Sequence, residues 1–139
     1  MATVAYSPLG RGMLTGAYKS NKDFEEGDFR KISPRFNDEN FPKNLQLVHG
    51  IEKIATKKGC TPGQLTLAWL LAQGDDIFPI PGTKKIKYLE ENLGALDVKL
   101  TSEEEKEIRK LVEGTVVHGL RYPEAMVGYL FASTPPLNA

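Results

Sequence analysis

The sequence predicts an α/β fold in which helices connect parallel strands. Two short segments rich in β-branched and aromatic residues, 3–7 and 77–80, have the composition of strands. Several other segments carry apolar residues at three- and four-residue spacing, which predicts amphipathic helices. Strands that alternate with helices are typical of parallel sheets. Because only two strands are recognisable, too few for a closed barrel or a doubly wound sheet, we expect an incomplete structure.

The composition is that of a globular protein of one-domain size. The chain has 139 residues, of which 40% are hydrophobic and 26% are charged. Its 18 basic and 18 acidic residues balance, so no overall field favours nucleic acid or anionic lipid. Any basic site must therefore be local.

The cysteine content and the hydropathy of the sequence indicate which metal sites and which cellular location to expect. Cys60 is the single cysteine, which excludes an internal disulfide and a cysteine-rich metal site. No apolar run approaches the roughly 20 residues of a membrane-spanning helix. The first six residues lack the basic and apolar regions of a signal peptide. We therefore expect a cytoplasmic protein.

The N-terminal third combines a strand with an unusually long connection. Residues 3–7 form the first predicted strand, and Pro8 with the following glycines ends it. From Leu14 to Phe41 the chain is polar with scattered phenylalanines. This length exceeds that of an ordinary connection, so the segment is expected to be a functional loop or a disordered one.

Two consecutive helices are predicted between the strands. The first begins near Pro42, which suits a first-turn position, and ends at Gly59. The second begins at the capping box Thr61–Gln64 and ends by Gly74. Their predicted apolar faces consist of Leu45, Val48, Ile51 and Ala55, and of Leu65, Ala68, Trp69 and Ala72.

The second strand, 77–80, contains Pro79 and is followed by Pro81, which argues against a central antiparallel position. A third helix should follow Thr83. A second capping box, residues 101–104, should open the last helix. The inward-facing residues of these two helices are predicted to be Ile86, Leu89 and Leu93, and Ile108, Leu111 and Val112.

Two lysines, Lys84 and Lys85, fall at the predicted start of the third helix. Cations there oppose the helix macrodipole by about 0.3–1 kcal/mol each. The arrangement is reasonable if an anion such as phosphate binds beside the free helix N–H groups. A solvated lysine pair is the alternative.

Three segments together resemble the C-terminal part of the aldo-keto reductases, (β/α)8 TIM-barrel enzymes that use NADPH. Residues 6–16 resemble the seventh strand and its loop, 61–71 the following helix, and 80–95 the eighth strand and its helix. Residues 121–124 are loosely similar to the pyridoxal-reductase-like branch. The resemblance implies an incomplete barrel that lacks the N-terminal half.

The resemblance also divides the chain into functional segments. We expect 1–16 to be a strand and cofactor loop, 17–41 a long loop, 42–112 the helices, second strand and cofactor segment, and 113–139 a C-terminal tail.

The resemblance implies that the catalytic residues lie outside this chain. The family's Asp, Tyr, Lys and His tetrad belongs to the first six strands, so we expect no catalytic residue here. The residues that do not match tetrad positions, despite their chemistry, are Tyr6, Tyr18, Tyr88, His49 and His118.

The resemblance does imply a binding site for NADP(H). Ser7, Leu9, Gly10 and Arg11 match the loop over the pyrophosphate, and Tyr6 matches an aromatic position that stacks on the nicotinamide. The residues Gly82, Thr83, Lys84 and Lys85 match the segment that binds the 2′-phosphate. Tyr88 stands where some members place an arginine over the adenine, and Glu91 and Asn92 match the adenine-binding pair. No metal site is implied.

Several of these residues have an ordinary structural alternative. Arg11 could be a loop charge, and Glu91 with Asn92 could be polar residues of a helix surface. We expect Trp69 to lie in the core. Cys60 precedes a helix start, which could lower the pKa of its thiol, or it could be buried and inert.

Two functions remain open from the sequence. The first is the cofactor-binding part of an oxidoreductase that reduces aldehydes or ketones by hydride transfer. The second is a non-catalytic nucleotide-binding or assembly module. In either case unpaired strand edges favour self-association.

Overall fold

The computed structural model describes residues 1–128 and 130, and it divides into two compact units. One unit comprises Met1–Lys19 and Leu45–Val116, and the other comprises Ser20–Asn44 and the chain from Val117 onward. No helix in the described residues combines the length and the apolar character needed to cross a membrane.

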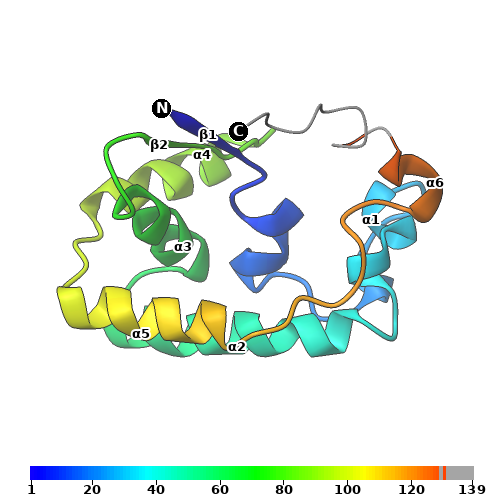
Figure 1. Cartoon of the computed structure of the whole chain (residues 1–139), viewed down its shortest axis with the longest axis horizontal. Helices are drawn as coiled ribbons and strands as arrows, with labels where there is room; N and C mark the ends of the chain where they lie inside the picture. Colours follow the sequence, from blue (N-terminus) through cyan, green and yellow to red (C-terminus); the bar gives the residue numbers. More distant parts are fainter. Residues whose placement is uncertain (129, 131–139) are drawn as a thin grey trace, which may run out of the picture. The chain divides into compact units, whose positions relative to one another are not determined.

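The sheet of the first unit confirms the predicted parallel arrangement. Strands β1 (Thr3–Tyr6) and β2 (Ile77–Ile80) pair in parallel, with Thr3 opposite Ile77 and Tyr6 opposite Ile80 (Figure 1). They form a two-stranded sheet within the described part of the chain. The helix α3 (Pro62–Leu71) packs against β2.

The two faces of this sheet differ in their exposure. Side chains of paired residues in parallel strands lie on the same face, which groups Val4 with Phe78 and Tyr6 with Ile80. These four side chains are 48% to 60% exposed. On the other face, Ile77 and Pro79 are half-buried. One complete face of the sheet is therefore apolar and uncovered in this unit.

The core of the first unit lies among α2 (Phe41–Lys58), α3 and α5 (Ser102–Glu113). Its buried cluster consists of Ile51, Ile54, Ala55, Leu65 and Ile108. Lys58 Nζ donates to Glu104 Oε2 at 2.7 Å, which joins the end of α2 to the start of α5. The predicted helix starts and their apolar faces are largely confirmed, although Ala72 and Val112 are exposed.

The local signals that bound these helices are also confirmed. Pro42 lies in the first turn of α2, and Gly59 ends that helix with a φ of 76°. Thr61 and Thr101 each complete a capping box, at α3 and at α5.

The predicted burial of the helix α4 (Ile86–Leu93) is wrong. Ile86, Leu89 and Leu93 are 75%, 49% and 56% exposed. Helical periodicity shows which side of a helix is apolar, but it does not supply an element to cover that side. A short 3₁₀ helix, η4 (Gly94–Asp97), follows directly.

The segment expected to be a long loop, 17–41, is largely structured. It contains η2 (Asn21–Asp23), α1 (Phe29–Ile32) and η3 (Pro34–Phe36). Phe24, Phe36 and Phe41 form a buried cluster with ring centroids 5.3–6.0 Å apart. A disordered loop is therefore a wrong prediction, and a functional role stays a prediction.

The buried side chain of Asn44 orders the second unit further. Its amide donates to the carbonyl oxygens of Arg35 and His118, both at 2.9 Å. Beyond it lies the short helix α6 (Glu124–Val127). The Pro135–Pro136 pair of the predicted tail lies outside the described residues.

Candidate cofactor-binding site

Two loops leave the sheet from the same edge. Tyr6 and Ile80 are the last residues of β1 and β2, and they lie opposite each other. Segments 7–12 and 81–85 therefore start side by side at the carboxyl ends of two parallel strands. In barrels of parallel strands this edge carries the active site, and phosphate groups often bind there.

The loop after β1 has a strained backbone. Ser7 and Arg11, neither of them glycine, have φ angles of 50° and 58°. For such residues the left-handed region costs about 1–2 kcal/mol each. Gly10 and Gly12 share this region, and their N–H groups donate to Ser7 O at 2.9 Å and Leu9 O at 3.0 Å. Strain held in place by local hydrogen bonds is typical of ligand clamps. The loop ends in the 3₁₀ helix η1, Gly10–Thr15.

The loop after β2 presents the two lysines to solvent. Lys84 and Lys85 are exposed, and neither has an acidic partner among residues 1–128 and 130. The structure corrects their predicted place in the first helical turn, because α4 begins at Ile86 and Lys85 is its N-cap. They remain at the positive end of the helix, so the unfavourable electrostatics persist.

The neighbouring side chains order this loop locally. The Thr83 hydroxyl accepts a hydrogen bond from the Lys85 amide at 3.2 Å. The Lys85 ammonium lies 5.8 Å from the centroid of the Tyr88 ring, within the range of a cation–π interaction. Gly82 is exposed, and no atom lies near the position that a Cβ would take there. One face of Tyr88 thus already meets a cation.

Glu91 and Asn92, near the end of α4, are half-buried. Glu91 Oε1 accepts a hydrogen bond from the Thr61 hydroxyl at 2.8 Å, and its carbonyl oxygen accepts one from Gln64 Nε2 at 3.2 Å. The sequence showed the capping box of α3. It did not show the contacts of Thr61 and Gln64 with Glu91, because these partners lie about 30 residues apart.

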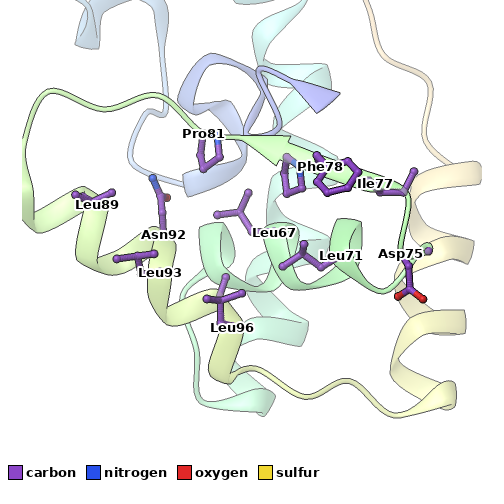
Figure 2. Close-up of a pocket in the computed structure, with 13 residues that line it drawn as sticks. Leu67, Leu71, Asp75, Ile77, Phe78, Pro81, Leu89, Asn92, Leu93 and Leu96 are labelled. Carbon is purple, nitrogen blue, oxygen red and sulfur yellow. The ribbon is translucent and has the colours of Figure 1, made fainter. Parts of the chain in front are cut away.

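A hollow of about 610 Å³ lies between α3, β2, α4 and η4. Figure 2 shows Leu67 and Leu71 from α3 facing Leu93 and Leu96, and Asn92 projecting from α4 toward the loop that holds Pro81. The lining is mainly leucine and proline, which suits an apolar occupant and not a phosphate group. The lysines do not line this hollow.

No role in the cofactor site is assigned to Cys60, Trp69, His49 or His118. Burial raises the pKa of the Cys60 thiol, so the alternative of an activated thiol is wrong. Trp69 packs against the core cluster, as predicted. His49 is exposed on α2. The backbone carbonyl and amide of His118 form hydrogen bonds with the side chain of Asn44. Among the described residues no group of three or more His, Cys, Asp or Glu side chains is placed to hold a metal ion.

Comparison with known sequences identifies a single family. The profile described as "Aldo/keto reductase family" matches residues 1–113. The aldo-keto reductase yakc [NADP(+)] of Schizosaccharomyces pombe is 63% identical over 134 residues, and the aldo-keto reductase str7 of Strobilurus tenacellus is 55% identical over 134 residues. Each alignment covers 96% of this chain and 39% of the relative, so the chain spans well under half of their length.

Comparison with solved structures agrees with the sequence comparison. The glycerol dehydrogenase AKR11B4 from Gluconobacter oxydans superimposes with a TM-score of 0.72 at 28% sequence identity. The match covers 86% of this chain and 36% of that one.

Proposed function

Because this chain belongs to the aldo/keto reductase family, we propose that it is the NADP(H)-binding C-terminal part of an oxidoreductase. The family uses NADP(H), and the name of the fission-yeast relative specifies NADP(+). In the proposed parent enzyme the chain forms strands seven and eight of the (β/α)8 barrel with their helices. The parent reduces aldehydes or ketones.

The main support for this proposal is the register of the two strands. With Tyr6 opposite Ile80, the strained loop 7–12 and the lysine loop 81–85 begin next to each other. A nucleotide with several phosphate groups can contact both loops at once. Lys84 and Lys85, which have no acidic partner among the described residues, provide a local positive charge in a chain of balanced total charge.

In this proposal each part of the site contacts a different part of the cofactor. Lys84 and Lys85, with Gly82 and Thr83, hold the 2′-phosphate, and segment 7–11 covers the pyrophosphate. Glu91 and Asn92 hydrogen-bond to the adenine, Tyr88 stacks on it, and Tyr6 stacks on the nicotinamide. The bound cofactor supplies the hydride, while the protein orients it.

The proposal includes no catalytic residue in this chain. On the resemblance, we expect none of the family's tetrad residues among the residues of this chain. We therefore expect the isolated chain to bind the cofactor without catalysing carbonyl reduction. A parent enzyme would combine this site with a tetrad from the other strands of the barrel.

Fluorescence titration of the purified chain with NADPH and with NADH tests the proposal. The reduced nicotinamide reports binding, and circular dichroism verifies that the helices have formed. We expect tighter binding of NADPH than of NADH, because only NADPH carries the 2′-phosphate. Equal affinities for the two cofactors would refute the assignment of the lysines.

The uncovered sheet face supports a second function, that of an assembly module. Val4, Tyr6, Phe78 and Ile80 present a contiguous apolar face, and each strand has an unpaired edge within the described sheet. Exposed strand edges pair readily with other strands. We propose that the isolated chain self-associates through these edges.

Light scattering coupled to size-exclusion chromatography distinguishes the two functions. A dimer or larger species that does not bind NADPH would favour the assembly module over the cofactor-binding function. A monomer at high concentration would contradict self-association and leave the nucleotide-binding proposal in place.

A further inference from the structure

The capping box of α3 makes an additional pair of contacts. The Thr61 hydroxyl accepts from the Gln64 amide at 3.1 Å and donates to Glu91 Oε1 at 2.8 Å. The Gln64 side chain accepts from the Thr61 amide at 3.0 Å and donates to the Glu91 carbonyl at 3.2 Å. The Thr61 hydroxyl thus accepts within the cap and donates to Glu91, whereas Gln64 uses its amide oxygen for the cap and its amide nitrogen for Glu91.

These contacts fix Glu91 at two points. One hydrogen bond holds an oxygen of its carboxylate, and the other holds its backbone in the last turn of α4. The second carboxylate oxygen makes no hydrogen bond among the described residues. The Thr61 hydroxyl therefore holds one oxygen of this long side chain and leaves the other available.

The packing between the two helices depends on this arrangement. A Cβ at Gly94 would lie 2.5 Å from Gln64 Nε2, so a larger residue there would displace the amide from the Glu91 carbonyl. At Gly63 a Cβ would contact Glu91 Oε1 at 3.6 Å. The end of α4 and the start of α3 therefore approach closely around the carboxylate.

The capping box of α5 provides a contrast. Thr101 and Glu104 form the same reciprocal bonds at 2.8 Å and 3.2 Å. There the N3 side chain binds Lys58, and no described residue accepts a hydrogen bond from the Thr101 hydroxyl. The contact with Glu91 is therefore not a general property of a capping box in this protein.

We propose that Thr61 and Gln64 are positioning residues that orient Glu91 to accept a hydrogen bond from the exocyclic amino group of adenine. This inference rests on the proposed function, because it assumes that the nucleotide binds beside α4. Thr61 and Gln64 do not touch the nucleotide. They act through Glu91, by holding one oxygen so that the other remains available to the base.

The proposal is tested with 2′,5′-ADP and with its hypoxanthine analogue, which lacks the amino group but carries the same phosphates. Calorimetric titration measures the ratio of the two affinities. A hydrogen bond to a carboxylate predicts a preference of about tenfold for adenine in the unmodified chain. Because both probes carry the same charge, general electrostatic effects cancel in the ratio.

The informative variant is Thr61→Asp. Aspartate is a strong N-cap residue, so α3 keeps its start, but an ionised carboxylate cannot donate to Glu91. We expect the adenine preference to fall to within about twofold of unity. Thr61→Ser keeps the donor and should retain the preference. Thr101→Asp is the matched control, and it should also retain the preference.

The outcomes separate this inference from the function on which it rests. If Thr61→Asp keeps the full preference for adenine while Glu91→Gln loses it, Glu91 recognises the base without being oriented by Thr61, and the inference is overturned. If the unmodified chain binds both probes equally, Glu91 does not read the amino group and the inference also fails. If the unmodified chain binds neither probe, the proposed function fails together with it.

Discussion

Removing the charge of Lys84 or Lys85 should weaken binding of NADPH selectively. The substitution Lys84→Gln retains most of the side-chain length and deletes one positive charge. Neither lysine pairs with an acidic group among residues 1–128 and 130, so no described ion pair is broken. The change in affinity therefore reports the interaction with the ligand.

The exposure of the lysines sets the expected magnitude. Two unit charges 4 Å apart interact by about 1 kcal/mol in water and by about 4 kcal/mol at an effective dielectric constant of 20. Because Lys84 is exposed, the lower figure applies. A phosphate that carries about −1.5 to −2 charges raises it to about 1.5–2 kcal/mol, which corresponds to roughly a ten- to thirtyfold loss. Affinity for NADH should change by less than about twofold.

Titrations of Lys84→Gln, Lys85→Gln and Lys106→Gln with both cofactors test this prediction. Lys106 is an exposed lysine of α5, so its variant has the same net charge without altering the site. The preference for NADPH should also decrease as ionic strength rises, because exposed charges are screened. If Lys84→Gln weakens the binding of NADH as much as the binding of NADPH, the reasoning about the 2′-phosphate is refuted.

Three further predictions concern activity, assembly and pH. The purified chain should show no carbonyl-dependent oxidation of NADPH at 340 nm, and turnover would require a proton donor that we have not assigned. Phe78→Asp should reduce self-association measured by light scattering, because it places a charge on the uncovered face of the sheet, and an unchanged mass would exclude that face as the contact. The hydrogen bond from Lys58, supported by the Thr101 amide, lowers the pKa of Glu104 from its ordinary value of 4.5. This carboxylate therefore stabilises the fold above pH 4.5 and loses its contribution as the pH falls through the lowered pKa. Urea unfolding of Glu104→Gln should show a smaller decrease in stability below that pH than the unmodified chain, and an equal decrease would contradict this assignment.

Local signals in the sequence predicted the helices and strands well. The capping boxes at Thr61 and Thr101 and the glycine at position 59 mark boundaries that the structure confirms. These signals act within a few residues, through hydrogen bonds and backbone angles that the sequence specifies directly. The parallel pairing of the two strands also followed from their alternation with helices.

Features that depend on distant contacts could not be predicted in the same way. Ile86 and Leu93 have helical spacing, but burial requires a neighbouring element that packs closely, and both residues remain more than half exposed in the described part of the chain. The polar segment 17–41 has no periodic apolar pattern. Its structure depends on ring contacts between phenylalanines that are separated in the sequence. The contact between Thr61 and Glu91 joins residues 30 positions apart.

The candidate site shows the same division. The residue types of both loops were visible in the sequence, whereas their common position depends on the register that sets Tyr6 opposite Ile80. The left-handed backbone of Ser7 and Arg11 has no sequence signal, because neither residue is glycine.

NMR mapping with NADP(+) tests most directly whether the two loops bind one nucleotide. Amide shifts of the isotopically labelled chain would be followed during the titration. We expect the largest changes in segments 7–12 and 83–92, with a common dissociation constant. Changes confined to the second unit, or different constants for the two loops, would contradict a single shared site.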